Sequence, residues 1–159
     1  MRLGILSDTH LSAGGEWLEG LVARYFHDVD AILHAGDIVD GSVLDALGGR
    51  DVIAVCGNMD PLPLRKTLPA KLVMEINGHR LGLIHGWGSP WGIEERILKE
   101  FRKVDCIVFG HTHVAQVERR GDVLLFNPGS PTERRGAAEK SIGILDIGST
   151  IEGAVIALE

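Results

Sequence analysis

Three short apolar runs in the first third of the chain are separated by segments whose apolar residues recur at helical spacing. The runs cover residues 2–7, 31–35 and 52–56. The segments between them, 16–26 and 42–47, are predicted to be helices, the second with Ser42 as its N-cap. Strand–helix–strand alternation requires crossover connections, so we expect these three strands to pair in parallel.

The second half of the chain has a different pattern. Asn77-Gly78 and Gly121-Asp122 are turn pairs between neighbouring apolar runs, and they predict antiparallel hairpins. One more helix is expected at 93–101, and the proline-rich segment 61–69 is expected to be a loop. The remaining strands are expected at 71–76, 80–85, 106–109, 114–118, 123–126, 141–147 and 151–158. We therefore predict one mixed α/β domain, residues 1–159, with two packed sheets and outer helices.

Charge and hydropathy exclude two classes of function. The formal net charge of −6 argues against a general nucleic-acid binder, which would need a basic face. No apolar run approaches the roughly 20 residues that cross a bilayer, and the N-terminus does not resemble a signal peptide. Cys56 and Cys106 both lie in apolar runs, where a small buried hydrophobic residue is expected. Together these features predict a cytoplasmic protein.

Polar residues of the metal-ligand type follow five of the predicted strands. Each residue alone has an ordinary explanation, such as a turn, a helix cap or a histidine at a strand end. The carboxyl ends of strands in an open α/β sheet form a ligand crevice, so the five clusters can converge there. The clusters are Asp8 with His10, Gly36-Asp37, Gly57-Asn58, His85-Gly86, and Gly110-His111-Thr112-His113.

The composition of this set indicates a metal centre. Two aspartates, one asparagine and four histidines suit Mn, Fe or Zn, and no thiolate is included. Seven ligands are too many for one ion but fit two ions that share a carboxylate, and such pairs catalyse in-line displacement at phosphorus. Two divalent ions would outweigh Asp8, Asp37 and a bridging hydroxide in charge, so the site would attract an anionic phosphoester.

These motifs, in this order, resemble those of the calcineurin-like metallophosphoesterases, and more closely the small single-domain phosphodiesterases of bacteria and archaea. Asn127-Pro128-Gly129-Ser130 resembles a further loop of that subfamily, and the resemblance extends from residue 2 to about residue 148. It implies a four-layer αββα sandwich with the metal site at the C-terminal ends of strands. It also implies two divalent ions, with Mn favoured and Fe, Zn or Ni possible, and hydrolysis of aryl or nucleotide-type phosphodiesters.

The resemblance assigns roles by position. One ion would be bound by Asp8, His10, Asp37 and His113. The other would be bound by Asp37, Asn58, His85 and His111, so that Asp37 is the bridge. A hydroxide between the ions would be the nucleophile, and Asp37, Asn58 and His85 are the expected catalytic residues.

Two positions depart from the family pattern. Met59 stands where many members have a histidine thought to protonate the leaving oxygen, and loss of such help costs about 10²–10⁴-fold on poor leaving groups. Trp87 stands where subfamily relatives often have a second histidine. With Trp91 it could stack a base or aryl group, or it could pack the loop onto the sheet.

Three further residues have open roles. His34 is expected to be a core histidine or a partner of the ligands rather than a ligand itself. Arg134 and Arg135 belong either to a solvated loop or to the phosphate site.

Two alternatives remain beside the enzyme. The same subfamily resembles a eukaryotic retromer subunit that acts as a protein-binding scaffold, and a single-metal structural protein is the third possibility. The expected partner is a small phosphoester, with a nucleotide and a homo-oligomer left open, and no membrane or general nucleic-acid binding is expected.

Overall fold

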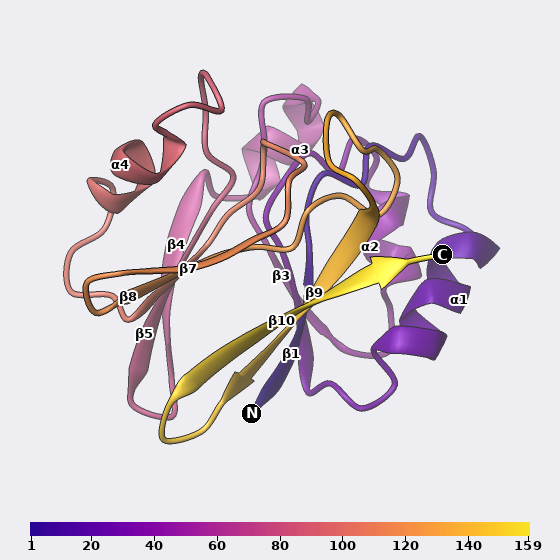
Figure 1. The fold of residues 1–159 in the computed structure, drawn as a ribbon. Helices are drawn as coiled ribbons and strands as arrows, with labels where there is room; N and C mark the ends of the chain where they lie inside the picture. The colour runs from indigo at the N-terminus through magenta and orange to yellow at the C-terminus, as the bar shows by residue number, and fades with distance from the viewer.

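The computed structural model describes all 159 residues and contains two five-stranded mixed sheets packed face to face (Figure 1). The first sheet has the order β10-β9-β1-β2-β3 and the second the order β4-β5-β6-β8-β7. The first comprises β1 (Arg2–Leu6), β2 (Ala31–His34), β3 (Asp51–Ala54), β9 (Lys140–Ile147) and β10 (Ile151–Leu158). The second comprises β4 (Lys71–Ile76), β5 (His79–Ile84), β6 (Cys106–Val108), β7 (Gln116–Arg120) and β8 (Val123–Asn127).

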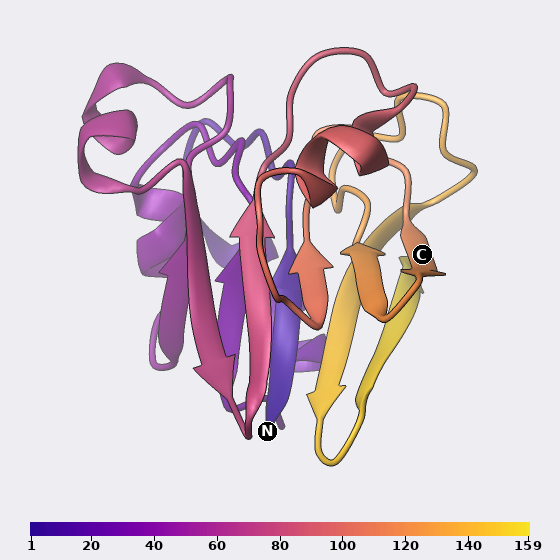
Figure 2. The ribbon, with the colours of Figure 1, turned by 90° about the vertical axis from the view of Figure 1, so that its left-hand side faces the viewer.

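Strand pairing confirms the predicted topology. β1, β2 and β3 pair in parallel, as the intervening helices require. β4 and β5 form an antiparallel hairpin whose turn residues, Asn77 and Gly78, both have positive φ, and β7 and β8 form a second hairpin. The connections that follow β1, β2, β3, β5 and β6 all lie at the end of the sandwich opposite the N-terminus (Figure 2).

The helices lie outside the sheets. They are α1 (Glu16–Tyr25), α2 (Ser42–Ala46), α3 (Leu62–Thr67) and α4 (Ile93–Leu98). Figure 1 shows α1 and α2 on the outer side of the first sheet and α4 on the outer side of the second. The four-layer αββα sandwich is therefore confirmed. None of the four helices has the length and hydrophobicity of a membrane-spanning segment.

Three apolar clusters hold these layers together. Between the sheets, buried residues of the first sheet such as Leu3 and Leu33 share a cluster with Leu81 and Val108 of the second. A second cluster joins α1 and α2 to the first sheet, and a third joins α4 to the second sheet. Each fully buried aliphatic side chain stabilises the fold by about 1.5–3 kcal/mol relative to an exposed one. The packed layers thus fix the strand ends from which the loops extend.

Two local predictions were wrong. The segment predicted as a loop at 61–69 contains α3, because Pro61 and Pro63 lie at its N-cap and first turn, where no backbone N–H is needed. Ser42 is not an N-cap but the first residue of α2. The side chain that accepts a hydrogen bond from the Ser42 N–H is Asp40, at 2.9 Å.

Both cysteines are free thiols. Cys106 is fully buried in the cluster between the sheets, as predicted. Cys56 is only partly buried, just beyond the end of β3.

Candidate metal centre

The five loops at the strand ends bring together all seven side chains that the sequence assigns to metal binding. They are Asp8, His10, Asp37, Asn58, His85, His111 and His113. Although they come from both sheets, their polar atoms form two groups with one residue between them. The parallel strands of the two sheets end on the same edge of the sandwich, which explains the convergence.

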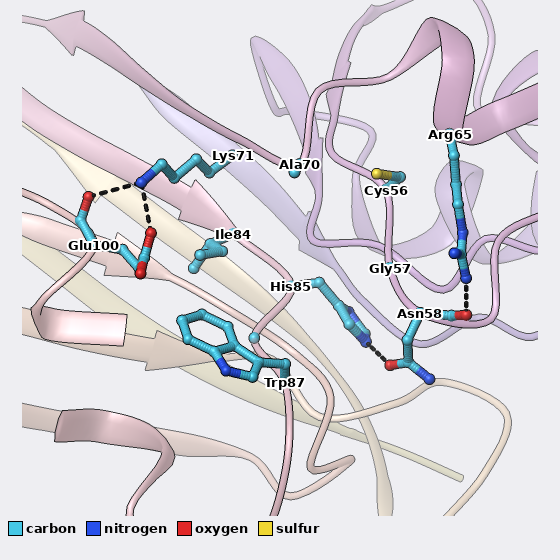
Figure 3. A pocket seen from close by; sticks show the side chains of 11 residues that line it. Cys56, Gly57, Asn58, Arg65, Ala70, Lys71, Ile84, His85, Trp87 and Glu100 are labelled. Atoms are coloured by element: carbon cyan, nitrogen blue, oxygen red, sulfur yellow. Dashed lines mark hydrogen bonds and ion pairs between the residues drawn. The ribbon is translucent and has the colours of Figure 1, made fainter. Parts of the chain in front are cut away.

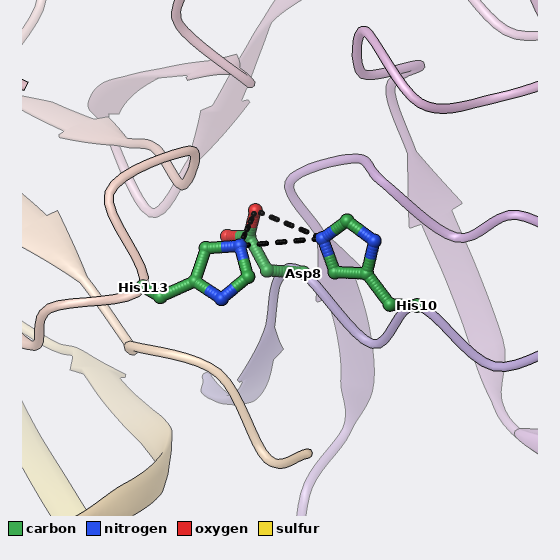
Figure 4. A group of neighbouring side chains, drawn as sticks. All are labelled: Asp8, His10 and His113. Carbon is green, nitrogen blue, oxygen red and sulfur yellow. Dashed lines mark hydrogen bonds and ion pairs between the residues drawn. The ribbon is translucent and has the colours of Figure 1, made fainter. Parts of the chain in front are cut away.

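The first group, which we call the closed side, consists of Asp8, His10 and His113. Asp8 Oδ1 lies 3.2 Å from His113 Nε2, and the Nε2 atoms of His10 and His113 are also 3.2 Å apart. Figure 4 shows both imidazoles beside the Asp8 carboxylate. Asp8 and His113 are fully buried and His10 is partly exposed, so most of this group is shielded from solvent.

The second group, which we call the open side, consists of Asn58, His85 and His111. Asn58 Oδ1 lies 3.1 Å from His85 Nε2 and 3.1 Å from His111 Nδ1. His85 is buried, whereas Asn58 is exposed and His111 is half-buried. Solvent and small molecules therefore reach this side directly.

Asp37 lies between the two sides. Its Oδ2 atom is 3.4 Å from His10 Nε2 and 3.3 Å from His85 Nε2. Its Oδ1 atom accepts a hydrogen bond from the Met59 N–H at 2.7 Å, which fixes the carboxylate. Asp8 Oδ1 also faces both histidines but is farther away, at 3.9 Å from each. Asp37 is thus the better placed of the two carboxylates to be shared.

The separations of 3.1 to 3.4 Å are those of ligands around one divalent ion. Imidazole nitrogen and carboxylate oxygen bind such ions at about 2.0–2.2 Å, so ligands about 90° to 109° apart are about 3.0–3.4 Å from each other. The hard oxygen and imidazole donors also match divalent transition metals. The residues present therefore fit divalent metal binding.

Backbone carbonyls orient two of the histidines. His85 Nδ1 donates to the carbonyl of Ala35 at 2.7 Å, which leaves Nε2 free to bind a metal. His111 Nε2 donates to the carbonyl of Gly88 at 2.7 Å, which leaves Nδ1 free. Such outer hydrogen bonds set the tautomer of a metal-binding histidine and are a usual part of these sites.

The charged groups of the centre shift one another's pKa. Burial acts to raise the pKa of Asp8, but its polar neighbours together outweigh burial and hold the pKa well below its usual range; they are His10, His113, His85 and Ser7. The pKa of His10 is raised, chiefly by Asp8. For His85, burial opposes protonation, but Asp37 and Asp8, with the carbonyl of Ala35, together outweigh burial and raise the pKa. His85 in turn lowers the pKa of Asp37 against the effect of burial. The carboxylates thus stay ionised and ready for a cation.

The backbone at the ligands is strained. Five of the seven lie in the left-handed region, with φ between 45° and 72°. Non-glycine residues rarely adopt these angles, and strained residues of this kind concentrate at functional sites. The five are Asp8, His10, Asp37, His111 and His113.

Two glycines are required by close approach of the loops. A Cβ atom at Gly57 would overlap Asp37 Oδ1, and a Cβ atom at Gly110 would overlap Ser7 Oγ. The glycines before Asn58 and His111 therefore let the ligand loops pack against each other.

The sequence did not reveal the role of Asp60, which connects two ligand loops. Its side chain is only 2% exposed. Oδ1 accepts hydrogen bonds from the N–H groups of Ile38 and Val39, and Oδ2 accepts one from Gly57, all at 2.7 Å. The only sign of this role in the sequence was that Asp60 directly follows Met59, next to the proposed ligand Asn58.

The loop after β8 supports the closed side. Ser130 Oγ donates to the carbonyl of Asp8 at 2.7 Å, and Asn127 Nδ2 donates to the carbonyl of Gly110 at 3.0 Å. All four residues are buried. The segment is therefore not an ordinary surface turn, because it fixes the backbone of two ligand loops.

Glu133 comes next in the same loop. Its Oε2 atom is 3.6 Å from His113 Nδ1, a buried nitrogen with no hydrogen-bond partner. Arg135 donates to the same Glu133 oxygen at 2.8 Å, and both Arg134 and Arg135 are exposed. The structure thus places Arg135 on Glu133, in line with the solvated-loop alternative.

His34 is fully buried behind the ligands. Its Nδ1 atom accepts the N–H of Gly36 at 3.2 Å, and its Nε2 atom lies 3.1 Å from Thr9 Oγ1. Burial lowers the pKa of His34 to about 4, which keeps the ring neutral. His34 is thus a partner of the ligand loops, as expected, and not a ligand.

Comparison with known proteins agrees with this geometry. A family model described as the calcineurin-like phosphoesterase superfamily domain matches residues 1–150. A probable metallophosphoesterase of Methanocaldococcus jannaschii is 40% identical over 163 residues, covering 100% of this chain and 82% of the relative. The solved structure of an archaeal phosphodiesterase matches with a TM-score of 0.76 and 28% identity, covering 99% of this chain and 100% of that one.

A eukaryotic protein shares the fold at lower identity. The structure of Entamoeba histolytica Vps29 in complex with Zn²⁺ matches with a TM-score of 0.71 and 22% identity, over 99% of each chain. This likeness concerns the fold alone. The family match over nearly the whole chain and the 40% identical relative lead to a firmer conclusion: the chain belongs to the calcineurin-like phosphoesterase superfamily.

Proposed function

We propose that this chain is a dinuclear metal-dependent phosphodiesterase that hydrolyses aryl or nucleotide-type phosphodiesters. The observation that carries the proposal is the position of Asp37 Oδ2, within 3.4 Å of one histidine on each side of the centre. A carboxylate oxygen placed in this way suits two ions that share a ligand. Family membership supports the phosphoester as substrate.

The proposed ligand sets follow the two sides. The closed side, with Asp37, would hold one ion, and the open side, with Asp37, would hold the other. Two such ions supply an activated water and neutralise charge on the phosphoryl oxygens. Around them, Asp37 is fixed by the Met59 N–H, and His85 and His111 are fixed by backbone carbonyls. Mn is the proposed metal, with Fe, Zn or Ni as other occupants of the same donor set.

The lack of a proton donor for the leaving group restricts the range of expected substrates. Met59 is 54% exposed beside the centre and cannot donate a proton. Without an acid at this position, diesters with good leaving groups, such as aryl phosphodiesters, are the favoured substrates. The two free thiols fit a reducing compartment, so we place the enzyme in the cytoplasm and treat residues 1–159 as one catalytic domain.

The second candidate is a metal-binding scaffold for other proteins. The fold shared with Vps29 favours it. In this case the centre would bind metal without hydrolysing phosphodiesters.

One assay separates the two functions. The Mn²⁺-loaded protein is tested on bis(4-nitrophenyl) phosphate and 4-nitrophenyl phosphate, beside Asp37→Ala and the control Asp122→Ala, which removes an exposed carboxylate from a hairpin turn. We expect hydrolysis of the diester by the wild type and the control, and its loss in Asp37→Ala. A wild type that binds two ions and remains inactive would favour the scaffold, and full activity in Asp37→Ala would refute the bridge.

A further inference from the structure

A cavity of about 380 Å³ opens directly beside the open side of the metal centre (Figure 3). Asn58 and His85 belong both to the centre and to the lining of this cavity. Its size falls within the range of pockets that hold small organic ligands. A substrate with its phosphate at the centre could therefore extend an ester group into the cavity.

One wall of the cavity is aromatic and aliphatic. Trp87, Ile84 and Ala70 contribute to it, and Figure 3 shows the Trp87 indole beside Ile84 and near His85. Trp87 is 42% exposed, so part of its indole remains available for contact. A base or aryl ring stacked on such a side chain gains about 1–3 kcal/mol. Trp91, in the same loop, is 88% exposed and takes no part in the cavity.

The loop that carries Trp87 is held in place on two sides. The Arg96 guanidinium on α4 donates to the carbonyls of Trp87, at 2.9 Å, and Trp91, at 3.0 Å. The carbonyl of Gly88 accepts from His111, a residue of the open side. The indole is therefore presented by a backbone fixed relative to the centre, and a ligand would pay little to order it.

The charges around the cavity favour a ligand attached to an anion. Lys71 is paired with Glu100 at 2.6 Å. Arg65 donates to the backbone carbonyls of Asp60 and Asn58 and forms no ion pair. Because these carbonyls carry no net charge, the positive charge of Arg65 is not neutralised. The lining thus carries one net positive charge next to an apolar wall.

We propose that this cavity is the subsite for a flat aromatic ester group of the substrate, an aryl ring or a base, with Trp87 as the residue that stacks on it. The proposal rests on the proposed phosphodiesterase function, because it assumes that the phosphoryl group binds at the metal centre. It concerns selectivity for the ester group, which the centre itself does not determine.

The test compares two phosphonates that differ only in their organic group. Binding of phenylphosphonate and methylphosphonate to the Mn²⁺-loaded protein is measured by calorimetry for the wild type, Trp87→Ala, Trp87→Phe and the control Trp91→Ala. We expect the wild type to prefer phenylphosphonate by at least about fivefold, from the lower end of the stacking energy. Trp87→Ala should lose this preference, Trp87→Phe should keep most of it, and Trp91→Ala should leave it unchanged.

Hydrolysis of bis(4-nitrophenyl) phosphate by the same proteins separates the two proposals. A preference for phenylphosphonate that depends on Trp87, in a protein without hydrolytic activity, would support the subsite and refute the phosphodiesterase. An active enzyme with equal affinity for the two phosphonates, or with a preference that survives Trp87→Ala, would refute the subsite alone.

Discussion

The closed and open sides of the metal centre use similar ligands in different surroundings. On the closed side Asp8 and His113 are fully buried, and the loop containing Ser130 holds the backbone of Asp8. On the open side Asn58 is exposed and lines the cavity beside Trp87. Structural metal sites are typically enclosed, whereas catalytic sites keep a position open for substrate.

This difference suggests that the two sides have different roles. The closed side would retain its ion firmly, and the open side would exchange its ion more readily and receive the substrate.

Removal of one ligand from each side should have the largest effect. We expect His113→Ala and Asn58→Ala both to lower kcat/KM for bis(4-nitrophenyl) phosphate by about 10³-fold, because loss of an ion removes about 4 kcal/mol of transition-state stabilisation. Metal analysis after gel filtration should distinguish them: Asn58→Ala should retain one tightly bound ion, and His113→Ala should not. The exposed His27 provides the control variant His27→Ala. Equal metal loss in both variants would show that the closed side does not retain its ion more firmly than the open side.

Asp60 should contribute to stability as well as to the open side. It is buried and accepts three backbone hydrogen bonds from two ligand loops. We expect Asp60→Ala to lower the free energy of unfolding by about 3 kcal/mol, because three N–H groups lose their partner. Urea denaturation of the metal-free protein measures this loss, with Asp122→Ala as the exposed control. An unchanged midpoint would show that the loops do not depend on Asp60.

Acid should weaken metal binding on both sides. The raised pKa values of His10 and His85 mean that protons compete with metal to a higher pH than for ordinary histidines. We expect Mn²⁺ affinity to fall by about tenfold per pH unit for each displaced proton as the pH drops below these values. Calorimetry below these pKa values, in buffers of different ionisation enthalpy, counts the protons released. Metal binding without proton release at such a pH would contradict the assigned ligand atoms.

The metal-free protein should respond to pH with the opposite sign. There, His10 and His85 contribute stability that is fully present below their ordinary pKa of about 6.5 and is lost as the pH rises through the raised values. Urea denaturation of the metal-free protein measures this loss, and a free energy of unfolding that does not fall as the pH rises would contradict the raised pKa values.

Glu133 should have the smallest effect, confined to the closed side. Its carboxylate faces His113 Nδ1 at 3.6 Å from a partly exposed position. Partners of metal ligands commonly contribute about 10–100-fold in affinity, and we expect the lower end for Glu133→Gln. Competition with a chelating dye measures the affinity of the tighter ion. If Glu133→Gln lowered the affinity of the weaker ion alone, Glu133 would not support the closed side.

The fold was largely predictable because its strands and hairpin turns have local signals. The three parallel strands followed from alternation with helices, and Asn77-Gly78 marked a hairpin. Helix α3 was missed because its prolines suggested a loop, although both lie where a helix tolerates them. Ser42 was mistaken for the N-cap because its side chain suits that position, whereas the helix begins at Ser42 itself.

The convergence of the seven proposed ligands was predictable for a different reason: all of them follow closely after strand ends. The supporting residues have no such marker. Asp60 accepts hydrogen bonds from Ile38 and Val39, which are 22 and 21 positions away, and Ser130 bonds to Asp8 across 122 positions. Only the folded chain shows these partners. The sequence also left Trp87 and Trp91 equivalent, whereas the structure assigns only Trp87 to the cavity.

Titration of metal into the metal-free protein tests whether the centre needs two ions bridged by Asp37. Bound Mn²⁺ and hydrolysis of bis(4-nitrophenyl) phosphate are measured on the same samples as Mn²⁺ is added. If hydrolysis requires both ions, there should be little hydrolysis up to one bound ion, then a rise in proportion to the second ion until two are bound. Full hydrolysis with one bound ion, or binding that saturates at one, would contradict a dinuclear centre bridged by Asp37.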